Sequence, residues 1–233
     1  PDMLFVIKGE TIFPPTLEYI KTEMKILCVA YLWDSPFYCP GSKSTDDYRR
    51  NNFAEGAHLY DHIFVYDPYY VNALNEKGIS QVSYLPLATD PDDYKKIEVL
   101  PKDGIEGGFD ICFVGAPSAN RIEILDSLIG FKLGVFGDGW RRWFWKKLRK
   151  APSYYRGKAT GEKVLKIYCS SKIVLNIHDS QAMSGLNTRT FDIPACGAFE
   201  LVDFKAELQR LFNVGDEIAR YKDKEDLKSL IRF

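Results

Sequence analysis

Short apolar runs alternate along the chain with segments whose apolar residues recur every three or four positions. The short runs predict strands at 3–8, 25–33, 62–67, 82–90, 109–116, 131–137, 172–178 and 198–203. The segments with the longer period predict helices at 14–24, 68–77, 120–130, 161–171, 188–197, 204–212 and 226–231. Because the strand runs are continuously apolar, they are typical of parallel sheets covered by helices on both faces. We therefore predict an α/β fold with parallel sheets.

The alternation is interrupted between residues 91 and 108. That segment, PDDYKKIEVLPKDGIEGG, is charged and contains prolines and glycines, as linkers do. It divides the chain into two α/β domains, 1–92 and 109–233, joined by a linker at 93–108. The chain enters a strand at its first residues and stops within a helical pattern, so we expect the first domain to be incomplete.

The composition is that of an ordinary globular chain. The 233 residues are 45% hydrophobic and carry a formal net charge of −1, so we expect no specific nucleic-acid partner. The five cysteines are scattered without a C-x-x-C pair, which indicates neither a structural zinc site nor a disulfide framework. No apolar run is long enough to form a transmembrane segment, and no signal peptide is evident. We expect a cytoplasmic protein.

The strongest local signal is the stretch MSGLNTRTFDIPACG at 183–197, between two apolar runs. Ligands of parallel sheets bind beyond the carboxyl ends of strands, which is where this stretch begins. Gly185 allows a close approach of the backbone to a ligand. Asn187 and Thr188 offer neutral donors, Arg189 can bind phosphate in a bidentate manner, and the N–H groups that open the following helix favour an anion. The alternative is an ordinary helix cap with a solvated arginine.

Two further features fit the same chemistry. Asp192, in the expected helix, could accept hydrogen bonds from both hydroxyls of a ribose, although the helix dipole alone explains an acid at this place better. A second loop, VGAPSANR at 114–121, joins a strand to a helix and carries Gly115 and Arg121. It matches neither the dinucleotide fingerprint nor the P-loop pattern. Two glycine loops, each followed by an arginine, favour a phosphate site.

The segment WRRWFWKKLRK at 140–150 contains six cationic and four aromatic residues. Such a composition suits contact with an anionic lipid or a polyanionic acceptor, and with it a peripheral position at the membrane surface. The alternative is a local lid whose tryptophans pack inward beneath the stems of the lysines and arginines. The sequence leaves both interpretations open.

Metal and nucleophile chemistry find little support in the sequence. His58 and His62 are four residues apart and could share a helix face, but the sequence around them continues directly into a predicted strand, so a metal site there is not favoured. DPDD at 90–93 is better explained as a turn than as a metal site. No G-x-S-x-G nucleophile elbow is present. We predict no metal site and no cofactor.

Six blocks of the chain resemble the CgeB-like spore-maturation proteins, a branch of the glycosyltransferases with the GT-B architecture. The blocks are LFVIKGE (4–10), YDHIFVYDPYYV (60–71), VSYLPLATDPDDY (82–94), FDICFVGAPSANR (109–121), TGEKVLKIYCSSKIVLNIH (160–178) and GLNTRTFDIPACGAFELVD (185–203). The resemblance implies two Rossmann-like domains that face each other across a cleft. It also implies a nucleotide-diphosphate sugar bound mainly by the second domain, and no obligatory metal.

The resemblance also implies roles for single residues. The range 185–189 would hold the donor diphosphate together with Gly115 and Arg121, and Asp192 would hold the ribose. Many such enzymes carry two glutamates separated by seven residues, the second of which meets the ribose. Asp192 stands in the second place but Ser184 in the first. Because the first acid is tied to the retaining families, the resemblance leaves open whether the transfer retains or inverts the configuration of the sugar.

A transferase also needs a group that orients or deprotonates the acceptor. In the first, acceptor-side domain Asp34 and Glu10 each follow a predicted strand, and we expect Asp34 to be the base with Glu10 behind it. The predicted function is transfer of a hexose from a nucleotide-diphosphate sugar to an unknown acceptor, polyanionic or lipid-linked. Two alternatives remain: a non-catalytic nucleotide- or glycan-binding module, and a surface-association protein that works through 140–150.

Overall fold

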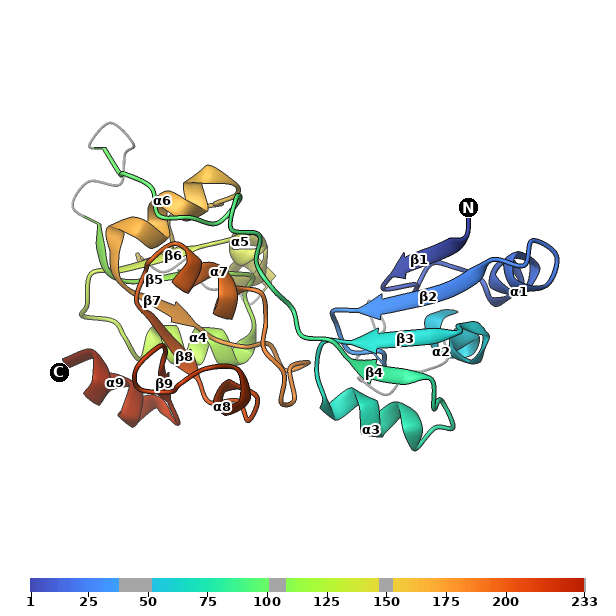
Figure 1. Ribbon diagram of the computed structural model, residues 1–233. Coiled ribbons are helices and arrows are strands. Elements are labelled where there is room, and N and C mark those ends of the chain that lie inside the picture. The colour runs from blue at the N-terminus through green and yellow to red at the C-terminus, as the bar shows by residue number, and fades with distance from the viewer. Residues whose placement is uncertain (38–51, 101–107, 147–152, 233) are drawn as a thin grey trace. The chain divides into compact units, whose positions relative to one another are not determined.

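The computed structural model of the protein describes residues 1–37, 52–100, 108–146 and 153–232 (Figure 1). They form two compact units, and each is built on a parallel sheet, as the continuous apolar runs predicted. The first unit comprises Pro1–Leu87 with the short segments Ser180–Leu186 and Lys205–Glu207, and the remaining residues form the second. The sequence had assigned both short segments to the second domain. Part of the predicted linker, 101–107, lies outside the described residues.

The first unit contains a four-stranded parallel sheet in the order β1-β2-β3-β4. Its strands are β1 (Met3–Ile7), β2 (Leu27–Leu32), β3 (His62–Val65) and β4 (Val82–Tyr84). Its helices are α1 (Pro14–Thr22), α2 (Asn52–Gly56) and α3 (Tyr69–Asn75), with the 3-10 turn η2 at Ala57–Leu59. Figure 1 shows the four strands side by side. Because Ile7 pairs with Tyr31 and Leu32 with Val65, the strands end along one edge of the sheet.

A buried aspartate fastens the segment Ser180–Leu186 to the first unit. Asp67, fully buried just after β3, accepts hydrogen bonds from the backbone N–H groups of Met183 at 2.8 Å and Ser184 at 3.0 Å. Its other oxygen accepts the Ser184 hydroxyl at 2.6 Å and the N–H of Tyr69 at 3.0 Å. A carboxylate removed from water needs such donors. Asp67 and this segment therefore hold each other in place.

The second unit contains a five-stranded parallel sheet in the order β6-β5-β7-β8-β9. Its strands are β5 (Phe109–Val114), β6 (Leu133–Phe136), β7 (Ser171–Asn176), β8 (Glu200–Asp203) and β9 (Ala219–Tyr221). Its helices are α4 (Ala119–Asp126), α5 (Trp140–Lys146), α6 (Glu162–Ser170), α7 (Arg189–Ala195), α8 (Leu208–Leu211) and α9 (Lys224–Arg232). From β5 the chain moves outward to β6 and then returns to β7 on the other side. The strand order reverses there, and such a switch point is where parallel sheets bind ligands.

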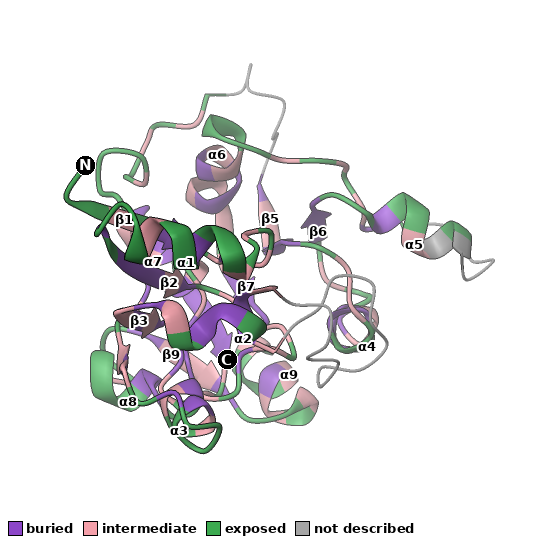
Figure 2. Cartoon of the chain, turned by 90° about the vertical axis from the view of Figure 1, so that its right-hand side faces the viewer, coloured by how far each residue is buried: buried purple, intermediate pink, exposed green. Residues whose placement is uncertain are grey.

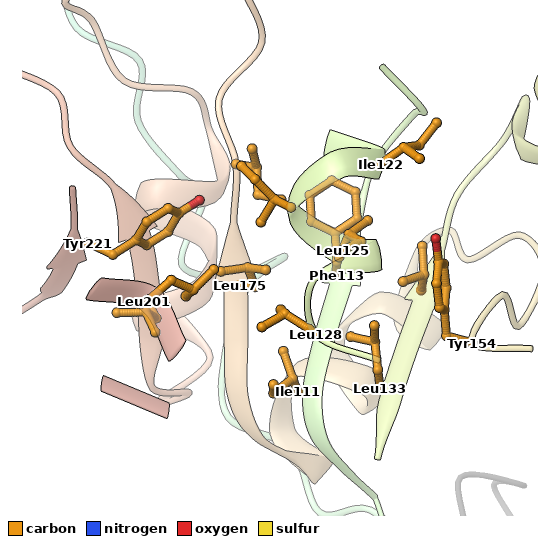
Figure 3. Packing of buried hydrophobic residues seen from close by; sticks show 14 of the residues in the cluster. Ile111, Phe113, Ile122, Leu125, Leu128, Leu133, Tyr154, Leu175, Leu201 and Tyr221 are labelled. Atoms are coloured by element: carbon orange, nitrogen blue, oxygen red, sulfur yellow. The ribbon is translucent and has the colours of Figure 1, made fainter. Parts of the chain in front are cut away.

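Alternate residues of β5 enter two separate apolar clusters, one on each face of the sheet. Ile111 and Phe113 belong to the larger cluster, and Cys112 and Val114 belong to the other. Figure 3 shows the larger cluster, with side chains of α4 packed against the strands. Figure 2 shows how far each residue is buried, with β6 buried throughout and much of α1 exposed. Burial on both faces explains why the central positions of these strands are mostly apolar.

The predicted helices and strands are present, but several are shorter than expected. The predicted strand 82–90 is β4 over three residues, and the predicted helix 204–212 is α8 over four. The sequence did not predict α2, α5 or β9, which are too short to carry a periodic signal. Among the described residues, no helix is long and apolar enough to cross a membrane.

Candidate functional site

The loops that follow β5 and β7 bring the predicted donor-binding residues of the second unit together. Gly115 directly follows β5, and a Cβ placed on it would lie 3.4 Å from Nη2 of Arg189 and 2.8 Å from the ring of Phe113. The Gly115 carbonyl accepts the indole N–H of Trp140 at 2.8 Å. A side chain at this position would therefore displace its neighbours, and the glycine serves this close approach.

Arg189 opens α7 and is the free cation of this site. Its side chain is half-buried, and within the described part of the chain it has neither an ion pair nor a hydrogen bond. Its charge acts on neighbouring Arg121, where it disfavours the charged guanidinium and lowers the pKa of that residue. The positive charge at Arg189 is therefore not neutralised within the unit, and this arrangement attracts an anion.

Arg121 holds the two loops together instead of presenting a free charge. The side chain is only 5% exposed, and its guanidinium donates to the carbonyl of Ile177 at 2.9 and 3.1 Å and to that of Ala116 at 3.1 Å. Burial lowers the pKa of Arg121, and neighbouring Arg189 acts in the same direction. The carboxylate of Asp179 lies 3.9 Å away. These contacts fix the loop after β5 relative to the end of β7.

Asp192 lies one turn into α7 and is 6% exposed. Its Oδ1 accepts the hydroxyl of Thr89 at 2.6 Å. Burial raises the pKa of Asp192, while the Thr89 hydrogen bond and the charge of Arg189 act in the opposite direction. The site thus places a buried carboxylate close to an unpaired guanidinium.

Asn187 is the most constrained of the predicted site residues. Its side chain exchanges two hydrogen bonds with the amide of Asn176 at the end of β7, at 2.9 and 3.0 Å. Its backbone N–H donates to Nε2 of His178 at 3.2 Å. Nδ1 of His178 in turn faces Asp203 at 2.7 Å, so the imidazole donates there and accepts at Nε2. The side-chain amide and the backbone N–H of Asn187 are therefore both hydrogen-bonded within the second unit.

Gly185 and Thr188, two residues of the predicted donor loop, lie in different surroundings from each other. Gly185 belongs to the first unit, where a Cβ would lie 2.7 Å from the Cα of Asp67. The close approach made by this glycine is to the protein's own backbone. Thr188 is exposed and precedes α7 without forming a side-chain cap. The first-turn N–H groups of Thr190 and Phe191 donate to the carbonyls of Asn187 and Thr188, so these two of the expected helix-terminus donors already have partners.

The predicted bases line one pocket of the first unit, at the carboxyl ends of β1 and β2. Its lining includes Lys8, Glu10, Asp34 and Phe53, around an empty volume of about 200 Å³. The Lys8 ammonium forms an ion pair with Asp34. Glu10 is half-buried and, among the described residues, has no ion pair or hydrogen bond. Lys8 also has a φ of 69°, a strained value for a residue with a side chain.

The aromatic side chains of α5 point in different directions. Trp140 is fully buried, whereas Trp145 is 81% exposed, and Arg141 and Arg142 are exposed as well. Residues one turn apart lie on the same side of a helix, so Trp145 shares a surface with both arginines. The rest of the predicted cluster, 147–150, lies outside the described residues. Within the described residues no group of three or more His, Cys, Asp or Glu side chains could hold a metal ion.

Several residues that shape the site were not singled out from the sequence. They are Asn176 at the end of β7, Glu200 and Asp203 at the two ends of β8, and Thr89 beside Asp192. Asn176 and Glu200 lie within apolar strand runs, and a polar residue inside such a run was the available signal. Thr89 gave no signal, because its contact with Asp192 joins positions more than a hundred residues apart.

Comparison with known proteins agrees with this fold. Residues 121–233 match a family model described as "Glycosyl transferase-like". Among solved structures, Anabaena Alr3699/HepE in complex with UDP-glucose superposes with a TM-score of 0.66 at 12% identity, covering 99% of this chain and 68% of that one. Sucrose-phosphate synthase from Thermosynechococcus elongatus gives 0.62 at 13% identity, covering 99% and 63%. The fold is therefore that of the GT-B glycosyltransferases.

One curated protein is similar to this chain over most of its length. The spore protein CgeB of Bacillus subtilis (strain 168) is 25% identical over 223 residues, which are 88% of this chain. The chain spans 65% of the length of CgeB. The match confirms the predicted resemblance to the CgeB-like glycosyltransferases.

The two arginines of the site should behave differently when each is replaced by methionine. Arg121→Met should lower the free energy of unfolding by about 2–4 kcal/mol, because buried carbonyls lose their donors. Arg189→Met should change it by less than about 0.5 kcal/mol, because this guanidinium has no partner to lose. Urea denaturation of both variants measures the difference. Equal losses in the two variants would show that Arg189 is also structural.

Proposed function

We propose that this chain transfers a hexose from a nucleotide-diphosphate sugar to an acceptor hydroxyl. The observation that carries the proposal is the unpaired, half-buried guanidinium of Arg189 beside the backbone of Gly115. It is supported by the match to a glycosyl transferase-like family model and by the likeness to a structure that contains UDP-glucose. UDP is therefore the first nucleotide to test.

Arg189 is assigned to the donor diphosphate. When the sugar leaves, the nucleoside diphosphate gains negative charge, and a fixed cation stabilises the charge that develops in the transition state. A guanidinium can bind two phosphate oxygens at once and needs no rearrangement if it is already free. Arg121 supports this role by holding the loops, since its own N–H groups are occupied by Ile177 and Ala116.

Asp192 is assigned to the ribose. Hydroxyl groups of a ribose donate to a carboxylate, and the Thr89 contact occupies only Oδ1. The nearby charge of Arg189 favours the ionised form of this buried acid. Asn187 and Thr188 complete the loop, with Asn187 as a support and exposed Thr188 as a donor to the ligand.

Glu10 is our first choice for the acceptor base, ahead of Asp34. A general base needs a lone pair that is not already engaged. The carboxylate of Asp34 is held by Lys8, whereas that of Glu10 has no such partner among the described residues. Lys8 and Asp34 would then shape the pocket that receives the acceptor. As the resemblance implies, the transfer needs no metal ion.

A second role is favoured by α5. We infer that its exposed surface contacts an anionic lipid layer, where an indole prefers the interface and guanidinium groups bind phosphates. The exposed fraction of Trp145, 81%, carries this inference, because a tryptophan in a local lid would pack inward as Trp140 does. An acceptor linked to a lipid would be accessible from such a position.

Nucleotide binding should depend on Arg189. Calorimetric titration with UDP should show binding that magnesium leaves unchanged and that exceeds binding of GDP, dTDP and ADP. Arg189→Ala should weaken UDP binding by about 10- to 100-fold, as expected for a charge-assisted contact. Arg232→Ala, an exposed arginine of α9, is the control. Unchanged affinity in Arg189→Ala would remove the proposed donor site.

Turnover should depend on Glu10. Release of UDP from UDP-glucose, with water as a slow acceptor, should fall by about 100-fold in Glu10→Gln while UDP affinity stays constant. Glu18→Gln, an exposed glutamate of α1, should behave as the wild type. A larger loss in Asp34→Asn than in Glu10→Gln would reverse the assignment. A wild type that binds UDP-glucose but never releases UDP would favour the non-catalytic binding module.

Binding to membranes should depend on Trp145. The protein should sediment with phosphatidylcholine vesicles that contain phosphatidylglycerol but not with pure phosphatidylcholine, and added salt should weaken the binding. Trp145→Ala should lower vesicle affinity by about tenfold, whereas Trp33→Ala, another exposed tryptophan, should not. Binding to a soluble polyanion but not to vesicles would replace the lipid by a polyanionic acceptor.

A further inference from the structure

A buried glutamate lies behind the loop that carries Arg189. Glu200, the first residue of β8, is 3% exposed, and its Oε1 accepts Nδ2 of Asn176 at 2.8 Å. Its Oε2 is buried and has no hydrogen-bond partner in the described part of the chain. A charged carboxylate in this position would lack the donors that it needs. The geometry therefore favours the neutral, protonated carboxyl.

Asn176 connects this glutamate to the start of α7. Its amide pairs with Asn187 and also reaches the hydroxyl of Thr190 at 3.1 Å. The Asn187 carbonyl oxygen of the side chain accepts the N–H of Thr190 at 3.3 Å. The chain of contacts from Glu200 therefore ends on the two residues that flank Arg189 along the backbone, at one and two positions away.

A second, independent contact fixes the same point. The backbone N–H of Asn187 donates to His178, whose imidazole is fully buried and bound to Asp203. Two strand ends, those of β7 and β8, are thus tied to one residue of the loop. In apolar surroundings such polar contacts hold only if each is satisfied, so they specify one position for the loop.

The charges that face Glu200 agree with a neutral carboxyl. The pKa of Glu200 is raised to about 8, chiefly by burial and also by the charges of Asp203 and Asp192. The hydrogen bond from Asn176 and the charge of Arg189 act in the opposite direction. Because the pKa is higher than in an unfolded chain, the stabilising contribution is complete at low pH and is lost as the pH rises through about 8.

We propose that Glu200 is a positioning residue for the donor site: its uncharged carboxyl holds Asn176, which holds Asn187 and thereby the start of α7 with Arg189. This role presupposes the nucleotide binding proposed for Arg189. Ionisation of Glu200 would place an unsatisfied charge behind the loop and release it. Nucleotide binding should then weaken in mildly alkaline solution.

The first test compares UDP affinity at about pH 7 and about pH 9. Wild-type affinity should fall by about tenfold over this range, while Glu200→Gln, which keeps the acceptor but cannot ionise, should bind equally well at both. Glu98→Gln, an exposed glutamate of the same unit, should follow the wild type. A Glu200→Gln variant that keeps the wild-type pH dependence, or that loses binding at neutral pH, would overturn the proposal.

The second test needs no nucleotide. At neutral pH the amides of Thr190, Phe191 and Asp192 should exchange with deuterium about tenfold faster in Glu200→Ala than in the wild type, and at the wild-type rate in Glu200→Gln. The amides of β5 should be unchanged in both variants. Unchanged exchange at 190–192 in Glu200→Ala would overturn the positioning role. If exchange behaves as expected but no variant binds UDP, the positioning role holds and the proposed donor site fails.

Discussion

The parallel pairing of β5 with β7 is the constraint on which the candidate site depends. After β5 the chain runs to β6, and after β7 it runs to β8 on the opposite side. The two loops therefore diverge, and backbone groups at this edge of the sheet have no partners in a neighbouring strand. Arg121 satisfies two of these carbonyls from inside the unit. The same geometry puts Gly115 against Arg189, because both follow strands that end side by side.

Buried polar side chains then decide which charges remain free. Around the ends of β7 and β8, His178, Asp203, Asn176 and Asn187 satisfy one another, and Arg121 is engaged by carbonyls. Arg189 is outside this set of contacts, so among the described residues of this site its charge remains available to a ligand. Buried polar contacts of this kind add little net stability, but they restrict the loop to one arrangement, which a binding site requires.

The stretch MSGLNTRTFDIPACG at 183–197 is held in place by two sets of buried side chains. Its first residues are held by the buried carboxylate of Asp67, whereas its later residues are held by Asn176 and His178. Ser184 thus has a partner in Asp67, at the position where the resemblance to GT-B glycosyltransferases implies an acid. A glutamate at 184 would meet that carboxylate, and the two like charges would repel in a buried place. A serine at position 184 therefore suits the surroundings of Asp67, whereas a second acid would not.

The sequence by itself determined the class of the fold, the two sheets and the loops that matter. Continuous apolar runs identify parallel strands because burial on both faces leaves few polar positions, and a glycine or arginine after a strand marks the ligand edge. The role of each residue within those loops could not be predicted in the same way. Gly185 faces Asp67, Arg121 is bound by carbonyls, and Glu200 supports Asn187, all through contacts between positions far apart in the chain. Only the tertiary structure decides such roles, because burial and hydrogen-bond partners belong to neighbours in space and not to neighbours in sequence.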